Sequence, residues 1–164
     1  GQNPYLEAAI SAARRGLEVR ILFDSYWYNT EGDSDNDEMA EYINAVAESE
    51  NLTLKAALID LDSLGAEKIH NKAVIVDGES VLISSVNWNE NSPSYNREAG
   101  VILSGGGVGE YYEEVFDYDW ERRQGAESGM ISSVFSEDEG SGLKCLLAFF
   151  VIALFAGIYV KRRR

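Results

Sequence analysis

The apolar positions of the first half of the chain alternate between helical and strand spacing. Asn3 suits a helix N-cap and Pro4 the first helical position, and the apolar spacing of a helix continues until Gly16. The segment "EVRILF", residues 18–23, then has the character of a strand. An amphipathic helix is predicted next, over residues 36–50. A helix that leads into a strand through a glycine turn is typical of α/β proteins.

Residues 52–123 are predicted to add four strands and one further helix. Strands are predicted over residues 52–60, 72–77, 80–86 and 98–104, and a helix over residues 109–123. We therefore expect an α/β fold for residues 1–124, with a mixed β-sheet flanked by helices.

Two of these strands form a predicted hairpin. We expect residues 78–79 to be the centre of a tight type II′ turn, which pairs residues whose numbers add to 157. Lys72 then lies opposite Ser85, and His70 lies opposite Asn87. Because side chains alternate across a strand, these four side chains are predicted to share one face of the sheet.

The residues on this face have chemistry that suits phosphate. His70 is the only histidine in the chain, and an imidazole can act as a nucleophile or as an acid and base near neutral pH. Lys72, Ser85 and Asn87 can donate hydrogen bonds to anionic oxygens. No second histidine or nearby cysteine accompanies His70, so we expect no metal. Asp77 lies on the other face and also fits an ordinary turn residue before glycine.

The end of the chain holds a long apolar run. Residues 143–160 carry no charge after Lys144, and a helix of this length spans about 27 Å, enough for a thin bilayer. We predict a transmembrane helix there, after a flexible acidic linker of Ser and Gly over residues 125–142. Residues 161–164, "KRRR", would form a basic cytoplasmic tail and leave the folded domain on the outer side of the cell membrane. A buried core helix is the alternative.

Charge and composition narrow the choice of partners. The chain has 28 acidic and 14 basic residues, a net charge of −14, which disfavours a general nucleic-acid binder. Cys145 is the single cysteine, so an internal disulfide is excluded. The chain starts at Gly1 without a methionine, and we interpret it as part of a longer protein.

Several short segments together resemble a known superfamily. "HNKAVIVD", residues 70–77, fits the pattern H-x-K-x-x-x-x-D, and "SSVN", residues 84–87, follows where G-[SG]-x-N is usual, with Ser84 in place of glycine. Ser92 fits a further serine, and "NREAGVIL", residues 96–103, resembles an N-x-E strand. From about residue 4 to residue 123 the chain resembles the phospholipase D superfamily.

The resemblance implies a phosphohistidine intermediate and a reaction that needs no metal or cofactor. The implied catalytic residues are His70, Lys72 and Asp77; the implied phosphate-binding residues are Lys72, Ser85 and Asn87; Glu98 would have a supporting role. From the residues alone, Glu98 could equally be an ordinary carboxylate at a strand edge.

The superfamily uses two such motifs in one active site, whereas this chain has one histidine. The second motif is expected from a missing N-terminal half, the favoured source, or from the partner in a homodimer. The resemblance implies a phosphodiesterase, which the predicted transmembrane helix would anchor to the membrane, and phospholipid is the favoured substrate. A nuclease of the same superfamily and a non-catalytic membrane-tethered binding module are the alternatives. Whether the reaction is hydrolysis or transfer is left open.

Overall fold

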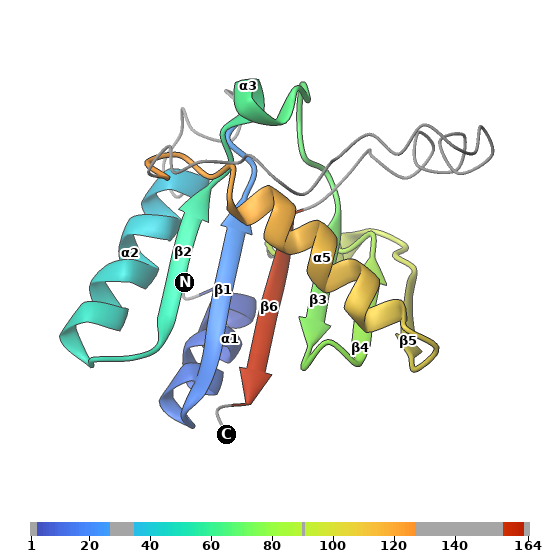
Figure 1. Ribbon diagram of the computed structural model, residues 1–164, viewed down its shortest axis with the longest axis horizontal. Coiled ribbons are helices and arrows are strands. Elements are labelled where there is room, and N and C mark those ends of the chain that lie inside the picture. Colours follow the sequence, from blue (N-terminus) through green and yellow to red (C-terminus); the bar gives the residue numbers. More distant parts are fainter. Residues whose placement is uncertain (1–2, 27–34, 90, 127–155, 163–164) are drawn as a thin grey trace, which may run out of the picture.

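The fold is a six-stranded mixed sheet with helices on both faces. The computed structural model describes residues 3–26, 35–89, 91–126 and 156–162 (Figure 1). The elements in chain order are α1 (Pro4–Arg14), β1 (Leu17–Phe23), α2 (Asn36–Ser49), β2 (Leu54–Leu58), α3 (Leu61–Leu64), β3 (Lys72–Val76), β4 (Ser80–Ser84), α4 (Asn91–Tyr95), β5 (Gly100–Ser104), α5 (Val108–Trp120) and β6 (Ala156–Arg162). The predicted α/β class is confirmed.

The strands lie in the order β2-β1-β6-β3-β4-β5. β1 pairs with β2 in parallel and with β6 antiparallel, while β3 runs parallel to β6 and antiparallel to β4. β1 and β3 therefore point in opposite directions. As a result, the carboxyl end of β1 and the amino end of β3 meet at the same edge of the sheet.

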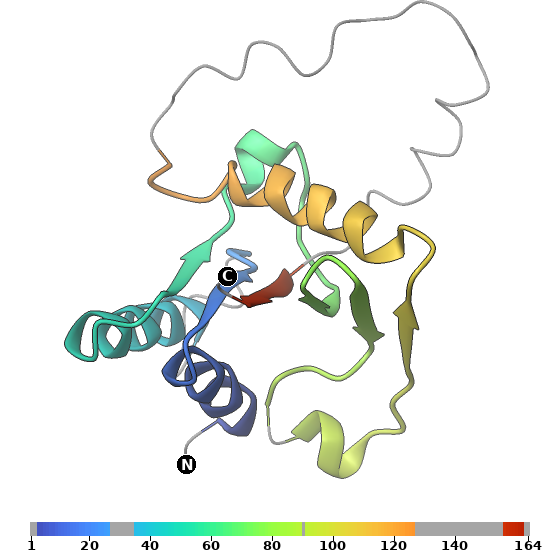
Figure 2. The same cartoon turned by 60° about the horizontal axis from the view of Figure 1, so that its bottom comes forward.

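Each face of the sheet buries its own apolar cluster. Helices α1 and α2 cover one face, where Ile10, Ile43 and Ile21 pack together. Helix α5 crosses the other face (Figure 2). Phe116 and Ile75 are buried on that face. The alternation of β1 explains both clusters, because successive side chains of a strand point to opposite faces.

The start of α1 agrees with the prediction from the sequence. The Asn3 side chain accepts hydrogen bonds from the backbone N–H groups of Tyr5 and Leu6, at 3.0 and 3.4 Å, and Pro4 is the first helical residue. Gly16 follows the helix with a φ of 88°, a conformation that glycine adopts without strain. These local signals fix where the chain enters β1.

The register of the β3–β4 hairpin corrects the prediction by one residue. Asp77 and Gly78 both have positive φ and form the centre of the turn, which Glu79 N–H closes by donating to the Val76 oxygen at 3.0 Å. An Asp-Gly pair favours a turn of this kind. Val76 pairs with Ser80, so three residues, 77–79, separate the strands, and Lys72 pairs with Ser84 rather than with Ser85.

The end of the chain also differs from the expected helix over residues 143–160. Residues 156–162 form β6 in the middle of the sheet, while residues 143–155 lie outside the described residues. Ile158 packs on the α1 and α2 face and Tyr159 on the α5 face. A β-branched and an aromatic residue buried on opposite faces suit a central strand, and an apolar run alone does not distinguish that strand from a membrane span.

Two other predicted segments of this region are covered only in part. Gly125 and Ala126 follow α5 in a turn, and the remainder of the predicted linker, residues 127–142, lies outside the described residues. Lys161 and Arg162 of the predicted tail belong to β6. Within the described ranges, no helix combines the length and the apolar character needed to cross a bilayer.

Candidate functional site

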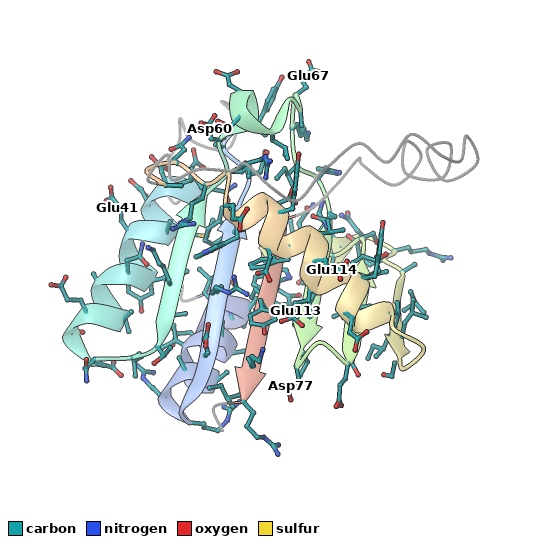
Figure 3. The ribbon with its side chains drawn as sticks, in the orientation of Figure 1. Glu41, Asp60, Glu67, Asp77, Glu113 and Glu114 are labelled. Atoms are coloured by element: carbon teal, nitrogen blue, oxygen red, sulfur yellow. The ribbon has the colours of Figure 1, made fainter. Side chains whose placement is uncertain are left out.

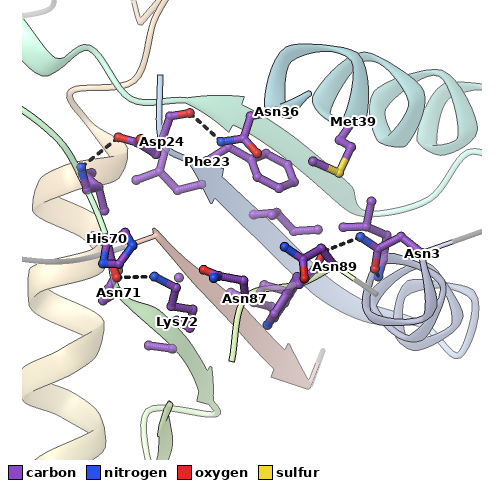
Figure 4. Close-up of a pocket in the computed structure, with 18 of the residues that line it drawn as sticks. Asn3, Phe23, Asp24, Asn36, Met39, His70, Asn71, Lys72, Asn87 and Asn89 are labelled. Atoms are coloured by element: carbon purple, nitrogen blue, oxygen red, sulfur yellow. Dashed lines mark hydrogen bonds between the residues drawn. The ribbon is translucent and has the colours of Figure 1, made fainter. Parts of the chain in front are cut away.

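A cavity of about 470 Å³ opens where the carboxyl end of β1 meets the amino end of β3. His70, Lys72 and Asn87 line one end of it, and Asn3 and Met39 lie toward the other end (Figure 4). Three of the side chains that the sequence predicted to converge therefore do line one cavity. They are not paired across the strands as predicted, because His70 lies before β3, Asn87 lies after β4, and Lys72 pairs with Ser84.

His70 lies just before β3 and is exposed. Partial loss of solvent around the ring, together with the positive charges of Lys72 and Lys68, lowers the pKa of His70 from the usual 6.5, while Asp24 opposes this shift. The imidazole is therefore mainly neutral at pH 7. A neutral imidazole has the free electron pair that a nucleophile or a base requires.

Lys72 is the first residue of β3 and is partly buried. Its Nζ donates a hydrogen bond of 2.6 Å to the main-chain oxygen of His70, which ties the amine to the residue beside it (Figure 4). Burial and the charge of Lys68 lower the pKa of Lys72 from 10.5, and Glu98 and Asp24 partly offset that change. The result is a cation at the mouth of the cavity.

Asn87 belongs to the irregular segment that follows β4. The hydroxyl of Ser92, a residue only 1 % exposed, accepts the Asn87 backbone N–H at 2.9 Å and donates to Glu98. Glu98 also accepts hydrogen bonds from Ser85 and from Asn96, and these donors lower its pKa from 4.5. An ionised carboxylate therefore organises the segment that presents Asn87.

The same segment is attached to α1. The Asn3 side chain donates to the Trp88 oxygen at 2.6 Å, and the Tyr5 and Trp88 rings stack with centroids 5.6 Å apart. These contacts hold the far wall of the cavity against the start of the helix. Trp88 thus lines the cavity as well as packing on its neighbours.

Two predicted site residues lie elsewhere. Ser85 is not among the residues that line the cavity, because its hydroxyl accepts the Ala99 N–H at 3.0 Å and donates to Glu98. Asp77 lies at the opposite end of β3 from Lys72, where its carboxylate accepts the Arg162 N–H at 2.7 Å (Figure 3). The structure therefore places Ser85 in the network of the loop and Asp77 in the turn.

Asp24 was not predicted from the sequence as a site residue. This carboxylate follows β1 directly, is 4 % exposed, and lines the cavity with His70. The signal was present, because an acidic residue that directly follows a buried strand often lies at an edge where strands end. Tyr26 follows two residues later, and the centroid of its ring lies 5.5 Å from Lys68 Nζ.

Acidic and metal-binding side chains do not form a metal cluster in the described part of the chain. No group of three or more His, Cys, Asp or Glu residues lies close enough there to hold an ion. The ionisable side chains that line the cavity are His70, Lys68, Lys72, Asp24 and Asp35, and side-chain amides such as Asn87 line it with them.

Comparison with known proteins adds one finding. The family described as cardiolipin synthase, PLD-like domain, where PLD stands for phospholipase D, matches residues 2–120. This range includes every element from α1 to α5 and ends before β6. No curated protein and no solved structure matches the chain.

Proposed function

The chain belongs to the cardiolipin synthase, PLD-like domain family of the phospholipase D superfamily, and we propose that it supplies one half of an active site that hydrolyses phospholipid phosphodiesters. The observation that carries the proposal is that His70, Lys72 and Asn87 line one end of a single cavity. A nucleophile, a cation and an amide donor at one place are what phosphoryl transfer requires.

In the proposed reaction an imidazole nitrogen of His70 attacks phosphorus. An N–P bond forms, and the bond from phosphorus to the leaving alcohol oxygen breaks. Lys72 Nζ and the Asn87 amide stabilise the negative charge on the non-bridging oxygens, where it increases in the transition state. The lowered pKa of His70 keeps the ring neutral for this attack.

Both steps need a second proton carrier, to protonate the leaving oxygen in the first and to deprotonate water in the second. A second imidazole protonates the leaving alcohol, then takes a proton from water, whose oxygen displaces His70 and releases the phosphomonoester. The chain has a single histidine, so this group comes from a partner. We propose an upstream half of the same protein as the source, with a second copy of the chain as the alternative.

Apolar side chains in the cavity and the acidic charge of the chain support a lipid over a nucleic acid as the substrate. The apolar side chains that line the cavity include Leu6, Phe23, Met39, Trp88 and Ile158. The net charge of −14 also repels a polyanionic strand at long range. A single phosphodiester joined to an apolar group suits both features.

Membrane localisation stays a prediction. It depends on residues 143–155, which lie outside the described residues, and on whether residues 156–160 remain in β6. Sedimentation of the full-length protein with vesicles, with and without residues 143–155, would decide it. Loss of sedimentation in the deletion variant supports an anchor, and unchanged sedimentation contradicts one.

The test of the function compares the full-length wild type with His70→Ala on phosphatidylcholine vesicles and on single-stranded DNA, both in EDTA. We expect release of choline by the wild type and a loss of at least about a thousandfold in the variant. Lys55→Ala, which changes an exposed lysine of β2 outside this cavity, is the control and should keep its activity.

Three results would contradict the proposal: lipid activity that survives His70→Ala, activity that requires a divalent metal, or cleavage of DNA alone. Cleavage of DNA with a steep salt dependence would instead indicate a nuclease. A rate per chain that rises in proportion to chain concentration identifies a second copy as the partner. A rate per chain that does not depend on concentration identifies an upstream half.

A further inference from the structure

Asp24 is a buried carboxylate inside the cavity. It is 4 % exposed and lines the same space as His70 and Lys72. A buried charge is destabilising unless other groups compensate it, so its partners indicate its role. Among the described residues, its partners include the backbone next to His70 and the charged groups around the imidazole.

The carboxylate is bonded to the segment that leads into β3. One Asp24 side-chain oxygen accepts the Ile69 N–H at 2.8 Å, and its main-chain oxygen accepts the Asn36 side-chain amide at 2.8 Å. Residues 66–71 have no regular secondary structure, so no ladder of backbone hydrogen bonds fixes them. The bond to Ile69 therefore holds the main chain one residue before His70.

The side chain of Ile69 strengthens this attachment. It is 4 % exposed and packs in the apolar cluster on the α5 face. With its side chain in the core and its N–H on Asp24, Ile69 has little freedom to rotate. The backbone is therefore fixed directly before His70, which lines the cavity.

The charge of Asp24 also acts on the imidazole. In the described part of the chain, the charged groups that influence His70 are Lys68 and Lys72, which favour the neutral ring, and Asp24, which favours the protonated ring. When His70 attacks phosphorus, its ring gains positive charge. A nearby fixed carboxylate stabilises that charge more in the transition state than in the ground state.

We propose that Asp24 is a positioning residue that fixes the backbone before His70 and offsets the positive charges around the imidazole. This inference rests on the proposed function for its effect on rate, but its structural part can be measured without any substrate. The imidazole signal of His70 is identified as the one that is missing from the spectrum of His70→Ala.

The test uses two variants and a matched control in the full-length protein. Asp24→Asn keeps an oxygen that can accept the Ile69 N–H but removes the charge, and Asp24→Ala removes both. Asp62→Asn changes an exposed carboxylate on α3 and serves as the control. The readouts are the NMR titration of His70, the hydrogen exchange of the Ile69 amide, and the pH profile of kcat.

We expect both Asp24 variants to lower the pKa of His70, because Asp24 raises it in the wild type. The acidic limb of the kcat profile should move to lower pH, and kcat at the optimum should fall about tenfold to a hundredfold. The Ile69 amide should stay protected in Asp24→Asn and lose protection in Asp24→Ala. If Asp24→Ala does not fold, Asp24→Asn still tests the charge.

An unchanged His70 titration in Asp24→Asn would overturn the inference, as would an Ile69 amide that stays protected in Asp24→Ala. If the wild type cleaves no phosphodiester, the proposed function fails. The NMR results still decide in that case whether Asp24 holds His70.

Discussion

Lys72 and Asn87 reach the same cavity from two sides that are built differently. The strand side is the β3–β4 hairpin, where regular pairing and buried apolar residues such as Ile75 and Val81 hold Lys72. The loop side is the segment between β4 and β5, residues 85–99, where hydrogen bonds to Glu98 and Ser92 hold Asn87. One side is fixed by packing, and the other by polar contacts.

This difference determines which changes each side tolerates. Packing in a core is lost when side chains are made smaller, since a cavity remains behind. A polar network is lost when one donor or acceptor is removed, because its partner is left without a hydrogen bond. Activity needs both sides. Stability should fall on the strand side when a buried side chain is made smaller, and on the loop side when a hydrogen-bond partner is removed.

Of the changes that compare the two sides, removal of the Lys72 cation should have the largest effect on activity. Lys72→Ala should lower kcat/KM for a phosphodiester by about a hundredfold to a thousandfold, because charge on the non-bridging oxygens loses its nearest amine. The midpoint of urea unfolding should change little, since Nζ bonds only to the His70 oxygen among the described residues. A loss of activity below about threefold would contradict the role of Lys72.

A change on the strand side that does not touch the cavity should affect stability instead. Ile75 is 0 % exposed, and Ile75→Ala should lower the free energy of unfolding by about 2–5 kcal/mol. Urea denaturation measures this loss. If the variant lost less than about 1 kcal/mol, the hairpin would not depend on the α5 core.

On the loop side, Ser92→Ala should lower the free energy of unfolding by about 1–3 kcal/mol, since the Asn87 N–H and Glu98 lose a partner. Activity should fall with it, because Asn87 is no longer held. Ser94→Ala, on the exposed surface of α4, is the matched control. Equal behaviour of the two variants would argue against the network.

The smallest expected effect is the pH dependence of the loop side. The pKa of Glu98 is lower in the folded chain than its ordinary 4.5, so its contribution is present above 4.5 and is lost as pH falls through the lowered value. The chemical shift of the Asn87 amide should follow this loss in the wild type and not in Glu98→Gln. The same acid transition in both proteins would exclude Glu98 as its cause.

The sequence predicted the elements better than their pairing. Helix α1 follows from Asn3, Pro4 and Gly16, which are local signals. The register of the hairpin depends on which two residues take positive φ, and Asp77 was not expected to be one of them. One residue of difference was enough to exchange Ser85 for Ser84 opposite Lys72.

Site residues that are close in sequence could be predicted. Site residues that are far apart in sequence and meet only in the folded sheet could not. His70 and Lys72 follow from a short motif, and Asn87 from its spacing to that motif. Asp24 reaches His70 only because β6 lies between β1 and β3 and sets them antiparallel. Residues 156–160 of β6 are the end of the apolar run 143–160, so the place of this strand in the sheet could not be inferred from hydropathy.

The most direct measurement is the covalent intermediate. The full-length protein is mixed with a phospholipid, quenched within the time of one turnover, and examined by mass spectrometry for a phosphorus adduct. We expect an acid-labile adduct on His70, located by sequencing the modified peptide that contains residues 70–77. An adduct on another residue of the chain, or turnover without any adduct on His70, would contradict it.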